Sequence, residues 1–135
     1  MKYFLTALFV TTLAICASAQ GTFVKGYIVT SKKDTIKGEV KLNPKKESEA
    51  YEKIYFKDQN GGQKTYKAAK LLEYGIGGDR FISLDTDGEP RFYKVLAQGA
   101  INFYVVLFET VRMNEISFEP EYYLAEPGNK EMETV

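Results

Sequence analysis

Residues 35–42 read Thr-Ile-Lys-Gly-Glu-Val-Lys-Leu, and they carry the clearest secondary-structure signal in the chain. Apolar and polar residues alternate along this segment, and a period of two is typical of a strand with one buried face. Gly38 stands on the apolar side, where a missing side chain lets the sheet bend or another strand approach closely. The preceding residues 23–30 are β-branched and aromatic, and the polar residues 31–34 join the two segments. The sequence therefore predicts an antiparallel hairpin over residues 23–42.

The rest of the chain consists of further short strand patterns separated by turn signals. Strands are predicted over residues 53–57, 63–67, 80–84, 91–97 and 101–108, and a last strand over 115–124 is interrupted by Pro120. The stretch 101–108 is apolar on both faces, which predicts a central, fully buried strand. Residues 68–74 have apolar side chains at helical spacing and precede Gly75, so one short helix is predicted there. The predicted fold class is mainly β: a small antiparallel barrel or sandwich, SH3-like or roll-like, with one short helix.

The N-terminus has the three parts of a secretory signal peptide. Lys2 supplies the basic start, an apolar run follows, and Ala17-Ser18-Ala19 offers small residues for cleavage. The apolar run is shorter than the roughly 20 residues that cross a bilayer, so an uncleaved anchor is the less favoured interpretation. Lipid attachment at Cys16 is a second alternative, but Ile15 stands where a small residue is expected. We expect an exported protein with a signal peptide over 1–19, a single β-rich domain over 20–126 and a flexible tail over 127–135.

Composition excludes several classes of function. The 135 residues include no His and a single Cys, which export would remove with the signal peptide, so His-based triads, thiol catalysis and most zinc sites are excluded. The formal net charge is 0, far from the basic balance of nucleic-acid-binding proteins. Residues 20–70 carry 12 Lys or Arg and 6 Asp or Glu, whereas residues 71–135 carry 5 and 12. We expect the two halves to pack together and neutralise each other; the alternative is a bipolar surface that binds a charged partner or a second copy.

Two polar stretches are interpreted as turns instead of ligand sites. Residues 75–79, Gly-Ile-Gly-Gly-Asp, lack the spacing of a dinucleotide-binding loop and follow a predicted helix. Residues 85–89 resemble part of a calcium loop, but Lys94 stands where the bidentate glutamate is expected. Several carboxylates leave a glycan hydrolase as a minor alternative; the candidates are Asp85, Asp87, Glu119 and Glu121. We assign no catalytic residue, no cofactor and no metal ligand.

Several motifs resemble an uncharacterised family of secreted or periplasmic proteins of Bacteroidota. Residues 26–30 read Gly-Tyr-Ile-Val-Thr, residues 34–40 read Asp-Thr-Ile-Lys-Gly-Glu-Val, and residues 92–99 read Phe-Tyr-Lys-Val-Leu-Ala-Gln-Gly. These are similar to the G-Y-I-x-T, G-D-T-I-x-G-x-I and V-L-x-x-G patterns of that family, with Lys33 in place of the turn glycine. The resemblance extends to Leu124 and implies a location in a Gram-negative cell envelope. It supplies no catalytic residue, and a fold analogy alone defines no function.

Together these features predict a non-catalytic β domain that binds a protein, a peptide or a glycan in the cell envelope. A structural subunit of an outer-membrane assembly is the alternative. We expect neither nucleic-acid binding nor a membrane span after signal cleavage, and the oligomeric state stays open. The charged connection over residues 43–52 is the predicted flexible loop, and loops often carry binding residues. The candidate interaction residues in this loop are Lys45, Lys46 and Tyr51.

Overall fold

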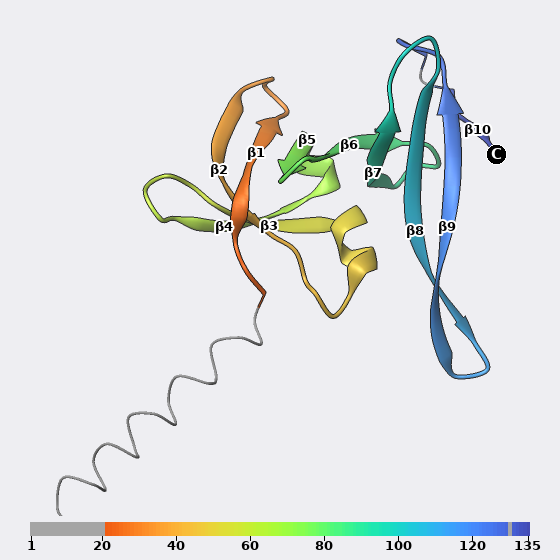
Figure 1. Ribbon diagram of the computed structural model, residues 1–135, viewed down its shortest axis with the longest axis horizontal. Helices are drawn as coiled ribbons and strands as arrows, with labels where there is room; N and C mark the ends of the chain where they lie inside the picture. The colour runs from red at the N-terminus through yellow and green to blue at the C-terminus, as the bar shows by residue number, and fades with distance from the viewer. Residues whose placement is uncertain (1–20, 130) are drawn as a thin grey trace, which may run out of the picture.

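The computed structural model describes residues 21–129 and 131–135 (Figure 1). The predicted signal peptide and Cys16 lie outside the described residues. The strands are β1 (Val24–Thr30), β2 (Thr35–Lys41), β3 (Lys53–Lys57), β4 (Gln63–Lys67), β5 (Leu71–Ile76), β6 (Asp79–Asp85), β7 (Pro90–Ala97), β8 (Asn102–Arg112), β9 (Glu115–Ala125) and β10 (Glu133–Thr134). Two short 3-10 helices accompany them, η2 (Glu47–Tyr51) and η3 (Ala68–Lys70). Strands make up 61% and helical residues 7% of the described part of the chain, which confirms the mainly β class. Among the described residues, no helix has the length and apolar character needed to cross a membrane.

The strands form one antiparallel sheet that does not close, in the order β10-β9-β8-β7-β6-β5-β1-β2-β3-β4. Strands β1–β4 occupy one end of this order and β5–β10 the other, so the two halves of the chain do not interleave. Seven ion pairs form among the described residues, and only Lys46–Glu109 joins the two halves. The halves pack together as expected, since Tyr51 of η2 contacts Phe81 of β6, but the strand order keeps most of their charges apart and the expected ion pairing is limited to the Lys46–Glu109 pair.

Aromatic residues build the core at the junction of the two halves. The ring of Tyr74 stacks on Phe81 with centroids 4.6 Å apart and meets Phe92 edge-on at 4.7 Å. The ring of Tyr51, from η2, meets Phe81 edge-on at 5.7 Å. The buried hydroxyl of Tyr74 donates a hydrogen bond of 2.7 Å to the carbonyl oxygen of Ala50. These contacts hold η2 against the sheet, so the segment predicted as a flexible loop supplies part of the core.

The predicted helix over residues 68–74 is wrong beyond its first turn. Ala68–Lys70 forms η3, and Leu71–Ile76 forms β5. β5 lies between β1 and β6, and the backbone groups of both neighbours require an extended partner. This pairing outweighs the weak helical preference of a few residues. Gly75 is consequently a strand residue and not a helix cap.

The two longest strands also differ from their predictions. β8 pairs with β7 and β9 but lies third from one end of the sheet, and only its residues 104–106 are buried. β9 continues through Pro120, because β10 pairs only with Tyr123 and Leu124 and leaves the rest of β9 as an edge. A proline, which lacks an N–H group, is tolerated on an edge strand. β10 itself comes from the segment that we expected to form a tail.

Candidate binding face

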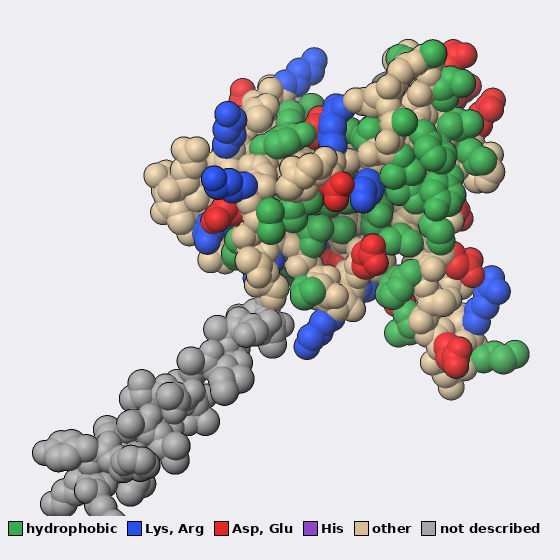
Figure 2. Space-filling view, viewed as in Figure 1, with side chains coloured by type: hydrophobic (Ala, Val, Ile, Leu, Met, Phe, Trp, Pro, Cys, Tyr) green, Lys and Arg blue, Asp and Glu red, His purple; other side chains and the backbone are tan. Residues whose placement is uncertain are grey.

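Strands β1, β2 and β3 present a basic surface on the side opposite the core. Ile28 and Val40 point inward and are fully buried, so their neighbours in the alternating pattern point outward. Strand register places these outward residues beside one another, with Tyr27 opposite Lys37, Lys25 opposite Glu39, and Lys41 opposite Tyr55. We define the basic face as Phe23, Lys25, Tyr27, Lys37, Glu39, Lys41, Lys53, Tyr55 and Lys57. Figure 2 shows many of the Lys and Arg side chains at the end of the molecule that holds β1 and β2.

Aromatic rings position lysine ammonium groups on this face. The Nζ atom of Lys41 lies 5.0 Å from the ring centroid of Phe23 and 5.3 Å from that of Tyr55. The Nζ atom of Lys57 lies 4.5 Å from the centroid of Phe23 and 3.0 Å from a carboxylate oxygen of Glu39. Cation–π contacts at exposed sites contribute about 0.5–1 kcal/mol each. The rings therefore hold the ammonium groups in place, and the lysine side chains cover the ring faces.

A hollow of about 820 Å³ lies within the basic face. Its lining includes Lys25, Lys37 and Lys57 from the three strands, with residues of the β3–β4 turn on one side. Gly26 and Gly38 face each other across β1 and β2 and also line it. A Cβ atom on Gly38 would lie 2.3 Å from the carbonyl oxygen of Lys57, so the close packing of β2 on β3 requires glycine. The result is a concave surface bordered by cations.

Glu73, a carboxylate near the basic face, is already neutralised, whereas Asp58 in the β3–β4 turn lines the hollow and accepts only backbone N–H groups, those of Asn60 and Gly62. Arg80 donates to Glu73 from Nε at 2.5 Å and from Nη2 at 3.1 Å, and the hydroxyl of Tyr27 donates to the same carboxylate at 2.5 Å. Burial by itself raises the pKa of Glu73, but these hydrogen bonds outweigh it and hold the pKa below its usual value. Burial and the bond to Glu73 raise the pKa of Tyr27 to about 12. Tyr27 therefore stays protonated and Glu73 stays ionised at neutral pH.

Three cations of the basic face keep their charge uncompensated. Glu39 is engaged by Lys57, and Glu73 by Arg80. Within residues 21–129 and 131–135, neither Lys25, Lys37 nor Lys41 takes part in an ion pair. Like charges that surround a concave surface raise the local positive potential and attract anions. This surface can hold a ligand that carries several negative charges.

The three interaction residues proposed from sequence do not form a shared exposed surface. Tyr51 is only 5% exposed and packs in the core. The Nζ atom of Lys46 lies 3.1 Å from a carboxylate oxygen of Glu109 in β8. Lys45 is exposed on the loop, and its backbone N–H donates to the side-chain oxygen of Asn43 at 3.0 Å. The alternation of lysine and glutamate in residues 37–41 indicated a charged outward face on this strand. The sequence did not show which other strands lie beside it.

Glu49 in η2 and three of the four hydrolase candidates have structural partners, whereas Asp87 forms no ion pair among the described residues. Glu49 in η2 is 8% exposed and accepts hydrogen bonds from Tyr55 at 2.8 Å and Asn43 at 3.2 Å. Burial raises the pKa of Glu49, but these hydrogen bonds and the charge of Lys53 lower it by a larger amount, so Glu49 stays ionised. Among the hydrolase candidates, Asp85 accepts from the N–H of Gly88 in the β6–β7 turn, Glu119 pairs with Arg112, and Glu121 accepts from Tyr123.

In comparisons with known proteins, no family model, no curated protein and no solved structure matches this chain. The fold and the site define a class only: an open antiparallel β-sheet protein with a concave basic face on its N-terminal strands.

Proposed function

We propose that this protein is a non-catalytic binding module whose basic face holds an acidic segment of a polypeptide. The observation that carries the proposal is the position of Lys25, Lys37 and Lys41 on the basic face, with Lys25 and Lys37 lining the hollow. None of the three has an ionic partner among the described residues. Complementary charge of this kind speeds association and selects partners of opposite sign.

The aromatic residues favour a polypeptide over a glycan as the ligand. Sugar binding by stacking requires open ring faces, and Phe23 and Tyr55 are covered by lysine ammonium groups. Carboxylate side chains spaced along a peptide can instead reach several lysines at once. Charge-assisted hydrogen bonds of this type are the stronger ones in proteins.

A binding assay with a defined probe tests this function. We expect a fluorescent deca-glutamate peptide to bind, and the double variant Lys25→Ala/Lys37→Ala to bind about tenfold more weakly. The matched control is Lys45→Ala/Lys70→Ala, which removes two exposed lysines elsewhere. Binding should weaken as salt is added, because exposed charges are screened. Equal losses in both double variants, or tighter binding of a sulfated oligosaccharide than of the peptide, would contradict the proposal.

We also propose that β1–β5 form an SH3-like roll to which β6–β10 are added. Support comes from the order β5-β1-β2-β3-β4 and from the 3-10 turn η3 between β4 and β5. An experimental structure in which β1 does not pair with both β2 and β5 would contradict this assignment.

Export to the cell envelope remains a proposal that rests on residues 1–19 and on the family resemblance. N-terminal sequencing of the protein recovered from the expressing cell tests it. We expect the mature chain to begin at Gln20. A chain that begins at Met1, or at a lipid-modified Cys16, would contradict cleavage after Ala19.

A further inference from the structure

The β8–β9 hairpin extends beyond the body of the protein as an arm, which we define as residues 108–119 (Figure 1). Its last pair is Arg112 with Glu115, and Met113 and Asn114 form the two-residue turn. Both turn residues have positive φ angles, 50° and 67°. Asn tolerates this region, whereas a long side chain such as Met rarely adopts it. Met113 is nonetheless at the tip, with a fully exposed side chain.

One face of the arm carries exposed apolar side chains toward its tip, while Glu109 on the same face pairs with Lys46 of the body. Val111 lies opposite Ile116 in the strand register, and their side chains are 65% and 63% exposed. Phe118 follows on the same face and is 41% exposed. With Met113 these residues make an apolar stripe that ends at the tip. Contiguous exposed apolar residues in a water-soluble domain commonly mark an interaction site.

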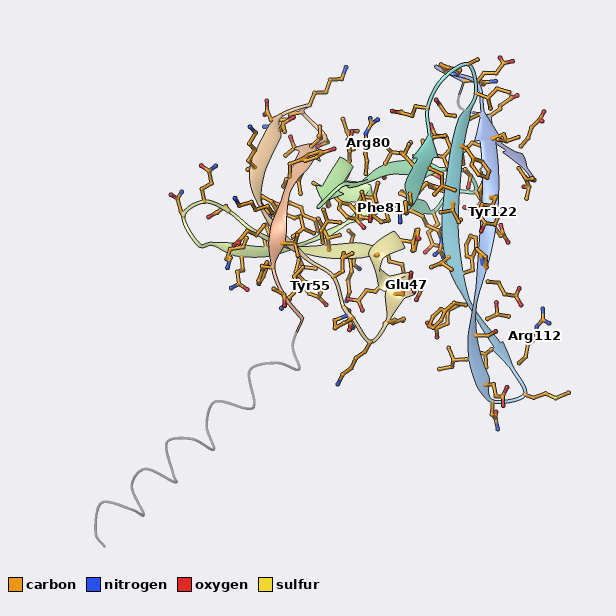
Figure 3. All side chains as sticks on the ribbon, viewed as in Figure 1. Glu47, Tyr55, Arg80, Phe81, Arg112 and Tyr122 are labelled. Carbon is orange, nitrogen blue, oxygen red and sulfur yellow. The ribbon has the colours of Figure 1, made fainter. Side chains whose placement is uncertain are left out.

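The opposite face of the arm carries two acidic residues, because Glu115 and Glu119 alternate with Ile116 and Phe118 along β9. Glu115 stands next to the turn, and Glu119 lies 3.1 Å from Arg112, the one basic residue of the arm. In Figure 3, Arg112 lies near the end of the arm and points away from the body. An apolar tip next to Glu115, which forms no ion pair among the described residues, is complementary to a hollow that is bordered by Lys25 and Lys37. The aliphatic stems of these lysines provide apolar surface below their ammonium groups.

The arm and the basic face lie at opposite ends of the molecule, so the arm of one copy does not contact the basic face of the same copy (Figure 1). We propose that the arm of one copy docks into the basic face of a second copy. Met113 enters the hollow, and Glu115 pairs with Lys25 and Lys37 at its border. This inference rests on the proposed function, because it names the acidic polypeptide as another copy of the same chain.

Such a contact is heterologous, since it joins two different surfaces. Each copy then offers one arm and one basic face, and heterologous contacts generate rings or open filaments. The separation of charge along the chain favours this arrangement, because residues 20–70 hold an excess of basic residues and residues 71–135 an excess of acidic ones. The inferred assembly is therefore a homopolymer of this chain.

Light scattering coupled to gel filtration tests the assembly with the mature protein. We expect mass to increase with protein concentration at about 0.01 M salt and to return to that of a monomer at about 1 M salt, where the Debye length falls to about 3 Å. The variants Lys37→Glu and Glu115→Lys should each associate about tenfold more weakly. An equimolar mixture of the two should associate again, because each variant keeps one native surface and the two altered surfaces attract each other. Lys45→Glu and Glu126→Lys are the matched controls and should leave association unchanged.

Other outcomes separate this inference from the proposed function. A protein that stays monomeric at every salt concentration, yet binds deca-glutamate through Lys25 and Lys37, overturns the self-assembly and leaves the function standing. Association that is unchanged by Lys37→Glu but is lost in Ile116→Ser indicates pairing of two apolar stripes. This outcome also overturns docking of the arm into the basic face. Absence of both association and peptide binding overturns the two proposals together.

Discussion

At the scale of single residues, Gly26 sets how closely the central strands approach. A Cβ atom at this position would lie 2.1 Å from the carbonyl oxygen of Gly75 and 2.9 Å from a methyl group of Val40. We expect Gly26→Ala to lower the free energy of unfolding by about 2–3 kcal/mol, because backbone of β5 must move. Urea unfolding measures the loss. Gly78→Ala is the control, since a Cβ atom there meets nothing within 4 Å; equal losses would contradict the steric argument.

A second residue-scale prediction concerns Glu73 and pH. The pKa of its carboxyl lies below the ordinary value of 4.5 in the folded protein, so the stabilisation it provides is present above that value and is lost as pH falls through the folded pKa. Glu73→Gln should lower the free energy of unfolding at pH 7 and weaken its decrease during acidification below about pH 4.5. Unfolding curves at pH 7, 5 and 3.5 measure both effects. Glu89→Gln, whose side chain is 74% exposed, is the control; an identical response in the two variants would argue against the partly buried network of Tyr27, Glu73 and Arg80.

At the scale of an element, the β8–β9 turn couples stability to assembly. Asn-Gly is the favoured pair where both turn residues need positive φ. Replacing Met113-Asn114 by Asn-Gly should raise the free energy of unfolding by about 0.5–1 kcal/mol and should weaken self-association. Met113→Ala should weaken association without the gain in stability, because a side chain at positive φ remains. Thermal unfolding and light scattering measure the two properties; stronger association in the Asn-Gly variant would contradict a docking role for Met113.

At the scale of the whole molecule, η2 connects the two halves of the chain. The bond from Tyr74 to the carbonyl of Ala50 and the contact of Tyr51 with Phe81 anchor it. Tyr74→Phe leaves this buried carbonyl without its donor and should cost about 1–2 kcal/mol. We expect faster hydrogen exchange in residues 47–52 in particular. Tyr66→Phe is the control, because no described residue bonds its hydroxyl in the structure. Unchanged exchange in η2 would show that packing alone holds it.

Several parts of the fold were predictable because their signals are local. Alternation over residues 35–42 identified β2, and the outward positions of Lys37 and Lys41 followed from the same period of two. Strand β5 was missed, since its six residues have an ambiguous period and take their conformation from β1 and β6. Pro120 was misread as an interruption, because its tolerance depends on whether β9 has a neighbour on its free side.

The amino-acid sequence alone established the mainly β class, the opening hairpin and the lack of histidine chemistry, because composition and side-chain period are properties of the chain read residue by residue. The strand order was decided only in the tertiary structure. That order kept most charges of the two halves apart, placed Tyr51 in the core and brought Lys25, Lys37 and Lys57 around one hollow. These features depend on which distant strands hydrogen-bond to each other, and the free energy of that pairing comes from contacts between residues far apart in the chain.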